Sequence, residues 1–314
     1  MRFVNFTLSH CPSEAQAGWL LEGRIYPLFS LLDLPAPLPM GGGWGLDSMA
    51  RLGEWRQALA ELDPGRLASA SSHASDEVVL WPPVHPCPSF RDFYAFEQHV
   101  KTARGRRGLE MVPQWYEAPV FYFSNANALL GHGAEVTPPP DGEWLDFELE
   151  VAAVIGTAGK DIPLERAEQH IAGFTVINDW SARAIQRQEM KVGLGPAKGK
   201  DFATSVGPAL VTPDELEDRR LGKGYDLEMT ARVNGRELSR GNWASITFSF
   251  AEMIARASRG VWLQPGDLMG SGTVGTGCIL ELGPENTGGW LQPGDEVELE
   301  IERLGVLRNR ISTQ

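Results

Sequence analysis

The sequence predicts a mixed β/α fold dominated by strands, with an antiparallel sheet at its centre. Three observations predict this class. Apolar and alternating runs fill the second half of the chain, where helical patterns are few and short. Asn234-Gly235 between two such runs is a strong signal for a tight hairpin. Trp-Leu-Gln-Pro-Gly-Asp occurs twice, at 262–267 and 290–295, and each copy is expected to form a turn that leads into a strand.

Composition narrows the classes of function. The chain has 314 residues and a net charge of −13, which argues against a nucleic-acid or anionic-membrane surface because phosphate binding needs a basic patch. Cys11, Cys87 and Cys278 are far apart, so neither a disulfide framework nor a zinc site is indicated. No apolar segment follows the first residues. A cytoplasmic protein with buried thiols is expected.

The first 85 residues are expected to form a small domain of unknown function. Strands are predicted over 2–8 and 19–29, and a helix over 48–62. The glycine run 41–43 lacks the Lys-Ser/Thr of a phosphate loop and is interpreted as a flexible turn. A proline-rich joint at 81–88 then predicts a boundary, with a larger domain over 86–314.

Ser89 and Asp92 have the spacing of an N-cap and an acidic third residue, which predicts a helix running to about residue 103. On such a helix Asp92 and His99 share a face about 10.5 Å apart along the axis, so they could flank a small molecule. Alternatively, Asp92 only caps the helix and His99 is a surface residue. The basic cluster that follows is either a solvated helix end or an anion contact: Arg104, Arg106 and Arg107.

Paired carboxylates precede an apolar run at 151–155. On a strand Glu148 and Glu150 point the same way, with Cα atoms about 6.5 to 7 Å apart, which suits two ligands of one ion. The alternative is that the two carboxylates only form the solvent-exposed face of a half-buried strand. Ala152 and Val154 continue that face and are apolar, which favours carboxylates at the mouth of an interior. Oxygen ligands favour Mg²⁺, Ca²⁺ or Mn²⁺ over Zn²⁺.

The later segments supply further polar residues. A helix is predicted over 163–171, closed by Gly173, followed by a buried strand at 174–177. Asp179 follows that strand and is either a site residue or a cap. The glycine-rich loop 193–202 would deliver one lysine to a pocket. Ser249 and Glu252 form a capping-box pattern that opens a helix ending near 260.

Six motifs resemble those of the fumarylacetoacetate hydrolase family, in the family's order, over residues 89 to 310. They are Arg91-Asp92-Phe93-Tyr94 with Gln98-His99, Asp146-Phe147-Glu148-Leu149-Glu150, Asn178-Asp179-Trp180-Ser181-Ala182-Arg183 with Gln186, Gly199-Lys200, Ser271-Gly272-Thr273-Val274-Gly275 and Ile279-Leu280-Glu281-Leu282. The resemblance implies a mixed β-sandwich roll that encloses a divalent metal, Mg²⁺ or Ca²⁺, usually in a homodimer.

The resemblance also implies roles for individual residues. His99 would be the general base, oriented by Glu281, with Lys200 supplying positive charge near the reacting group. The implied metal ligands are Asp92, Glu148, Glu150 and Asp179. The implied substrate contacts are Tyr94, Tyr122, Arg183, Gln186 and Thr273. Met190 departs from the family, which has a tyrosine at that position, and the family's substrate-binding arginine is not assigned among 104, 106 and 107.

These roles suit hydrolysis of a carbon–carbon bond in a β-diketo acid such as fumarylacetoacetate or an acylpyruvate. Water must attack one carbonyl, and the leaving carbanion is tolerable only as an enolate, which a chelated metal stabilises. A decarboxylase, hydratase, isomerase or lyase acting on a related 2-oxo acid is the main alternative, and breakdown of aromatic compounds, including tyrosine, suits both. A non-catalytic Ca²⁺-binding protein is a minor alternative.

Overall fold

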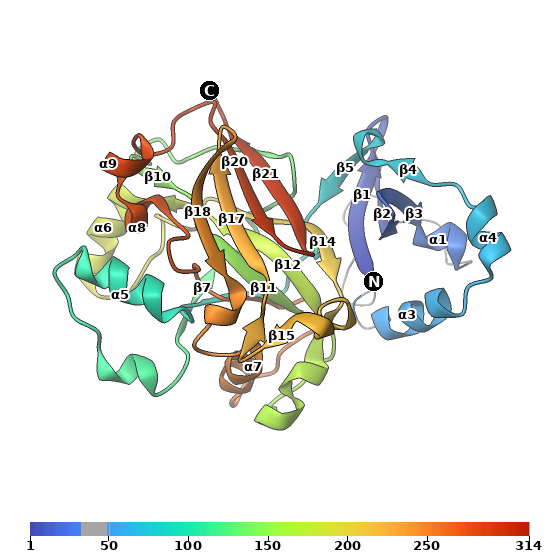
Figure 1. Ribbon diagram of the computed structural model, residues 1–314, viewed down its shortest axis with the longest axis horizontal. Coiled ribbons are helices and arrows are strands. Elements are labelled where there is room, and N and C mark those ends of the chain that lie inside the picture. Colours follow the sequence, from blue (N-terminus) through green and yellow to red (C-terminus); the bar gives the residue numbers. More distant parts are fainter. Residues whose placement is uncertain (33–48, 50, 314) are drawn as a thin grey trace.

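In the computed structural model, which describes residues 1–32, 49 and 51–313, two sheets pack face to face (Figure 1). The larger sheet is mostly antiparallel and continues into the N-terminal segment. The smaller sheet lies in front of it in the view of Figure 1, and helices cover the open sides. The strand-dominated mixed fold expected from the sequence is therefore confirmed.

The larger sheet has the order β4-β3-β2-β1-β14-β12-β11-β19-β6-β7, with β5 added beside β1 and β8 beside β14. Its strands are β1 (Arg2–Leu8), β2 (Cys11–Leu21), β3 (Arg24–Pro27), β4 (His73–Ala74), β5 (Val78–Trp81), β6 (Phe90–Phe93), β7 (Phe121–Ser124), β8 (Leu129–Leu130), β11 (Leu149–Ile155), β12 (Ile171–Asp179), β14 (Thr204–Val211) and β19 (Leu268–Gly270).

The smaller sheet has the order β18-β17-β20-β21-β9. Its strands are β9 (Glu135–Val136), β17 (Glu228–Val233), β18 (Arg236–Asn242), β20 (Glu296–Ile301) and β21 (Gly305–Ile311). Two short pairs complete the described strands: β10 (Leu145–Asp146) with β13 (Ser181–Ala182), and β15 (Arg220–Leu221) with β16 (Gly224–Tyr225).

The helices lie outside the sheets (Figure 1). The α-helices are α1 (Leu28–Leu31), α3 (Leu52–Ala60), α4 (Pro64–Ser69), α5 (Glu97–Gly105), α6 (Arg183–Val192), α7 (Phe250–Ala257), α8 (Ile279–Leu282) and α9 (Pro284–Thr287). The 3₁₀ turns are η1 (Ser75–Glu77), η2 (Pro113–Tyr116), η3 (Leu164–His170), η4 (Pro213–Glu215), η5 (Glu217–Arg219) and η6 (Trp243–Ser245). Across the described residues, no helix is both long and apolar enough to cross a bilayer.

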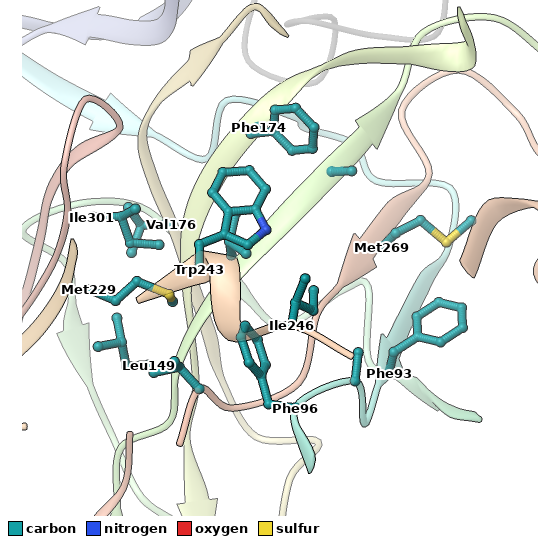
Figure 2. Packing of buried hydrophobic residues seen from close by; sticks show 14 of the residues in the cluster. Phe93, Phe96, Leu149, Phe174, Val176, Met229, Trp243, Ile246, Met269 and Ile301 are labelled. Atoms are coloured by element: carbon teal, nitrogen blue, oxygen red, sulfur yellow. The ribbon is translucent and has the colours of Figure 1, made fainter. Parts of the chain in front are cut away.

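The main core lies between the two sheets. Trp243 is completely buried there and packs edge-on against Phe174, with ring centroids 5.0 Å apart (Figure 2). Strand β11 is buried along its whole length because its two faces meet different cores. Val151 and Ala153 face the core between the sheets, and Ala152 and Val154 face a second core that α3 helps to cover. Such two-sided burial explains the continuous apolar run in the sequence.

The N-terminal segment is joined to the remainder by backbone pairing. Strand β1 pairs antiparallel with both β2 and β14, so one sheet runs across the proline-rich joint. Of the predicted elements, the strand at 2–8 is present. The helix predicted over 48–62 is present as α3, and its first residue lies outside the described residues, as does the glycine turn at 41–43. The boundary between residues 85 and 86 stays a prediction.

Several local predictions are confirmed. Asn234 and Gly235 both have positive φ, 51° and 76°, and connect β17 to β18. The side chain of Ser249 accepts a hydrogen bond from the amide of Glu252, the carboxylate of Glu252 accepts one from the amide of Ser249, and the capped helix is α7.

The repeated hexapeptide also forms the turns expected of it. In the first copy, the carboxylate of Asp267 accepts a 2.9 Å hydrogen bond from the amide of Gln264. In the second copy, the carboxylate of Asp295 accepts one of 2.8 Å from the amide of Gln292. The turns lead directly into β19 and β20.

The helix predicted from Ser89 is wrong in its first half. Residues Phe90–Phe93 form β6, whose four side chains are all buried between β19 and β7, and helix α5 begins only at Glu97. The Ser-x-x-Asp pattern is compatible with a helix start, but ladder hydrogen bonds and burial of the two phenylalanines outweigh that local preference. Asp92 and His99 therefore do not share a helix face.

Three further predictions need correction. The segment 163–171 forms the 3₁₀ turn η3, and Gly173 lies inside β12, where a Cβ would meet the carbonyl oxygen of Val211 at 2.6 Å. The strand predicted over 19–29 is split into β2 and β3 by a turn at Glu22-Gly23, both with positive φ. Glu148 precedes β11, because Asn178 Oδ1 accepts its amide hydrogen bond before the ladder starts.

Candidate functional site

Three carboxylates meet at one place in the larger sheet. Asp92 comes from β6, Glu150 from β11 and Asp179 from the end of β12, and one oxygen of each lies within 4.8 Å of the others. All three side chains are buried. Between β11 and β6 runs β19, whose Gly270 leaves the necessary space: a Cβ there would lie 2.3 Å from Asp92 Oδ1. Pairing of distant strands therefore assembles the cluster.

The cluster carries more negative charge than its surroundings neutralise. Burial, and then the charge of Asp179, raise the pKa of Asp92 well above its usual range. Burial is also the main cause that raises the pKa of Glu150 well above its usual range, and the charge of Asp92 is the second. Glu150 Oε2 is buried without a hydrogen-bond donor, while Oε1 accepts a 3.3 Å bond from Thr273. An all-oxygen, under-neutralised cluster of this kind fits a divalent cation such as Mg²⁺, Ca²⁺ or Mn²⁺.

Glu148 has a different environment from the three clustered acids. Lys200 Nζ donates to both Glu148 and Asp179, and Arg183 Nη2 lies 2.7 Å from Glu148 Oε1. Burial alone would raise the pKa of Glu148, but the two cations outweigh it and lower the pKa to about 2. Its charge is therefore balanced by Lys200 and Arg183. The structure thus groups three of the four predicted ligands and places the fourth beside them.

His99 and Glu281 form a buried pair beside this cluster. His99 Nδ1 and Glu281 Oε1 share a hydrogen bond, and Glu281 Oε2 accepts one of 3.1 Å from the amide of Thr276. The ring of Tyr94 meets the His99 ring edge-on at 5.3 Å. Helix α5 carries the histidine and α8 the glutamate, so the pair predicted from residues 182 positions apart is brought together.

Cys278 lies beside the same pair. His99, Cys278 and Glu281 each have one possible metal-ligating atom, and these three atoms lie within 4.8 Å of one another. They form a second group of residues that could hold a metal ion. Burial raises the pKa of the Cys278 thiol well above its usual range, which keeps it protonated and a poor ligand. The acidic cluster is therefore the better cation site.

Asp146 has a supporting position that its place in the sequence motif did not reveal. Its carboxylate accepts bonds from Arg183 Nε at 2.9 Å and from the amides of Ile279 and Leu280 at 2.7 and 3.0 Å. One buried side chain thus ties α6 to the first turn of α8. Hydrogen bonds to main-chain amides leave no pattern in side-chain types, so sequence inspection had no signal for this role.

A single pocket of about 1010 Å³ opens onto the cluster and the histidine. Tyr122 donates a 2.7 Å hydrogen bond to Asp179, and Gln186 accepts one of 2.9 Å from Arg183. All five predicted substrate contacts line this pocket: Tyr94, Tyr122, Arg183, Gln186 and Thr273. The pocket also includes several side chains that sequence inspection did not select: Trp144, Trp290, Arg187, Leu109 and Leu280.

Comparisons with known proteins identify the family of this chain. The family described as fumarylacetoacetate (FAA) hydrolase C-terminal matches residues 89–312. Fumarylacetoacetase of Arabidopsis thaliana is 32% identical over 243 residues, which cover 62% of this chain and 58% of that protein. Human mitochondrial oxaloacetate tautomerase FAHD2A is 37% identical over 195 residues, covering 62% of this chain and 59% of its own length. The matched part is thus about three fifths of each relative.

Among solved structures, fumarylpyruvate hydrolase from Pseudomonas aeruginosa, in complex with Mn²⁺ and pyruvate, superposes with a TM-score of 0.59. It is 25% identical, and the superposition covers 77% of this chain and 94% of that one. The family match spans well over half of the sequence and includes the three clustered carboxylates, the histidine and its glutamate partner. The chain belongs to the fumarylacetoacetate hydrolase family.

Proposed function

We propose that the protein is a metal-dependent hydrolase that cleaves a carbon–carbon bond in a β-diketo acid such as fumarylacetoacetate or an acylpyruvate. The observation that carries the proposal is the presence, in one pocket, of an under-neutralised carboxylate cluster and a carboxylate-held histidine. A cation held by this cluster would polarise a carbonyl of a diketo unit, and a histidine of this kind activates water.

Asp92, Glu150 and Asp179 would hold the cation, with Glu148 beside them. When bound, the cation would polarise the carbonyl under attack and stabilise the enolate that leaves. Mg²⁺ or Ca²⁺ is proposed, since the donors are hard oxygens. The Mn²⁺ in the fumarylpyruvate hydrolase complex shows that a structural relative takes a divalent ion of similar preference.

His99 is proposed as the general base. Its Nδ1 faces Glu281, which fixes the tautomer and leaves Nε2 free to accept a proton from water. The hydroxide then bonds to the acyl carbonyl carbon, the adjacent carbon–carbon bond breaks, and its electron pair goes to the departing enolate. The imidazolium returns a proton to the enolate carbon. The sum is one water consumed, with a carboxylic acid and a keto acid formed.

Positive and hydrogen-bonding groups would hold the substrate. Lys200 lies at the cluster, where the charges of Asp179 and Glu148 overcome burial and raise its pKa, so its ammonium persists beside the developing anion. Tyr94, Tyr122, Gln186 and Thr273 line the same space and are proposed substrate contacts. Arg183 is proposed as a further contact, although its guanidinium already binds three side chains: Asp146, Glu148 and Gln186.

The three arginines at the C-terminal end of α5 differ in their hydrogen bonds. Arg104 donates to the carbonyl of Glu110 at 2.6 Å, and Arg106 donates through two nitrogens to the carbonyl of Glu281. Among the described residues, the Arg107 side chain hydrogen-bonds through Nε alone, in a 3.1 Å bond to the carbonyl of Ala103. Within that part of the chain its two terminal nitrogens keep their donors for a ligand, so Arg107 is the proposed substrate-binding arginine of the three.

An isomerase-type reaction is the second candidate, because the relative at 37% identity is named as an oxaloacetate tautomerase. Enolate stabilisation by a cation serves both reactions, and the same holds for a decarboxylase, hydratase or lyase acting on a related 2-oxo acid. A structural Ca²⁺ site without turnover would not need the His99 and Glu281 pair. The homodimer and the cytoplasmic location stay predictions, the first testable by light scattering of the purified protein.

Isotope labelling separates these reactions. With fumarylacetoacetate or an acylpyruvate as substrate in H₂¹⁸O, hydrolysis must place one ¹⁸O atom in the new carboxylic acid, as read by mass spectrometry. A product of unchanged mass, or one that has lost carbon dioxide, would replace the hydrolase proposal with the isomerase or decarboxylase alternative.

A further inference from the structure

The outer half of the pocket differs chemically from the half that holds the carboxylates. Helix α6 leads from one to the other: Arg183 at its start is only 6% exposed, whereas Met190 is 40% exposed and Val192 81% exposed. Its N-terminal end therefore lies at the proposed reaction site and its C-terminal end at the solvent. A substrate extending outward from the cluster would pass along this helix.

One face of α6 lines the pocket throughout. Arg183, Gln186, Arg187 and Met190 all contribute to the lining, and their spacing of three, four and seven residues places them on a single helical stripe. At 1.5 Å of rise per residue, Arg187 lies about 6 Å farther along the axis than Arg183. The pocket thus presents a second guanidinium one helical turn outside the proposed reaction site.

Arg187 is held over an aromatic pair. Its guanidinium carbon lies 5.9 Å from the ring centroid of Trp144, and that ring stacks on Trp290 at 6.2 Å with an interplanar angle of 20°. Trp144 has a φ of +58°, a left-handed conformation that residues other than glycine rarely adopt. The main-chain carbonyl of Trp144 accepts a 3.1 Å hydrogen bond from the amide of Arg183, which joins this side of the pocket, the Trp144 wall, to the start of α6.

The charge of Arg187 is not neutralised by an ion pair among the described residues. Within the described residues, no carboxylate forms an ion pair with it, although the chain has 41 acidic and 28 basic residues. The acidic residues that line the pocket all belong to its buried end: Asp92, Glu148 and Glu150. Apart from Arg183 and Lys200 of that buried end, the basic lining residues are Arg104, Arg106, Arg107, Arg187 and Lys191. The mouth of the pocket would therefore attract an anion against the overall charge of the protein.

We propose that Arg187, seated on the Trp144–Trp290 pair, binds a second carboxylate at the far end of the substrate, so that this enzyme prefers dicarboxylic over monocarboxylic oxo acids. The proposal rests on the function proposed above, in which the dioxo end lies at the carboxylate cluster. In an extended 2,4-dioxoheptanedioate, with C–C bonds of about 1.5 Å, the five bonds from the C2 carbonyl carbon to the C7 carboxylate carbon span roughly 6 Å. This span is similar to the rise of about 6 Å along α6 from Arg183 to Arg187.

The test compares 2,4-dioxoheptanedioate with 2,4-dioxoheptanoate, which carries a methyl group in place of the second carboxylate. Wild type should bind the dicarboxylate more tightly, and Arg187→Gln should weaken that binding about 10- to 30-fold while changing the neutral-ended compound less than about twofold. Lys101→Gln removes the same charge from a helix position outside the pocket and should leave both affinities unchanged. Trp144→Ala should reproduce the loss, and adding it to Arg187→Gln should cost little more.

Dissociation constants are measured by calorimetry with Mg²⁺ in a His99→Gln background, so the answer does not depend on turnover. An unchanged ratio of the two affinities in Arg187→Gln, or an equal loss in Lys101→Gln, would overturn the second-carboxylate site while leaving the hydrolase proposal intact. If wild type fails to hydrolyse either compound but the ratio depends on Arg187, the hydrolase proposal alone fails. No binding of either compound would reject both.

Discussion

The guanidinium of Arg106 donates two hydrogen bonds, of 3.1 and 3.0 Å, to the main-chain carbonyl of Glu281, whose carboxylate meets His99. His99 lies in α5 and Arg106 is the residue that follows this helix, and both contact the same residue of α8. The short helix that orients the proposed base is therefore fixed at its backbone and at its side chain. A helix of four residues has little intrinsic stability, so this anchoring matters.

Arg106→Gln should misplace Glu281, and it also removes one positive charge from the pocket lining. We expect kcat to fall about 10- to 100-fold and KM to change much less, since a small displacement of a positioned group costs up to about two orders of magnitude in rate. Steady-state kinetics give both parameters. Lys101→Gln, on the exposed side of the same helix, is the control and should keep wild-type kcat. Equal kcat in the two variants would show that the anchoring is not needed for turnover.

His99→Ala should abolish turnover while leaving the cation site unchanged. The histidine contacts Glu281 and lies outside the three-carboxylate cluster, so its loss removes the proposed base but no proposed ligand. The expected drop in kcat is about 10²- to 10⁴-fold. Calorimetric titration with Mg²⁺ or Mn²⁺ should give the wild-type affinity. Retained activity would remove His99 from the proposed role.

Cation binding should be coupled to proton release. Burial, together with the charges of Asp179 on Asp92 and of Asp92 on Glu150, raises both pKa values, so an arriving cation competes with protons for these acids. Carboxylates with raised pKa values favour the folded state below those values and disfavour it as pH rises through them. Cation affinity should therefore increase with pH.

Calorimetry in two buffers of different ionisation enthalpy measures the proton release directly. Glu150→Gln should reduce both the number of protons released and the affinity. A heat of binding that is independent of buffer, with an affinity that is flat across pH, would contradict the assignment of this cluster as the cation site.

Gly270→Ala should disable the cluster through backbone crowding. A Cβ at this position would lie 2.3 Å from Asp92 Oδ1 and 3.0 Å from Ile177, so the aspartate must move. We expect a loss of about 1 to 3 kcal/mol in the free energy of unfolding, typical of overpacking, and weaker cation binding. Denaturant melts and cation titration provide the two readouts.

Gly53→Ala is the matched control for this substitution. Gly53 lies in α3, and an added Cβ would meet nothing within 4 Å. Alanine is the better helix former, so this variant should gain up to about 1 kcal/mol and bind the cation normally. If Gly270→Ala melts and binds like Gly53→Ala, the packing around Asp92 is looser than described.

The elements of the sheet-rich fold that could be predicted from the sequence are those set by the alternation of side chains along a strand and by the residues of a single turn. The hairpin at Asn234-Gly235, the capping box at Ser249 and the twin turns at Asp267 and Asp295 each rest on contacts within four residues. Strand β6 was missed because the same local pattern at Ser89 suits a helix start, and only pairing with β19 and β7 decides the outcome. Local propensity cannot register such long-range pairing.

Some residues of the candidate site were likewise predicted from the sequence, and others were recognised only in the structure. Local patterns had already raised the three clustered carboxylates and His99 as candidates, whereas their joint role and the pairing of His99 with Glu281 came from resemblance to family motifs. The structure brings these residues together. Asp146, Arg106 and the Trp144 wall were not selected, because their contacts involve backbone atoms or stacking between distant segments. Roles of this kind depend on geometry that residue types and spacing do not encode.

The measurement that tests the central claim most directly is the loss of absorbance of the conjugated diketo group, followed with fumarylacetoacetate and with a shorter acylpyruvate. Each substrate is assayed with Mg²⁺ and with EDTA. A hydrolase of the proposed kind consumes at least one of them with Mg²⁺, and EDTA stops the reaction until the cation is restored. Absorbance that stays constant for both substrates with Mg²⁺, or that falls equally fast in EDTA, would contradict it.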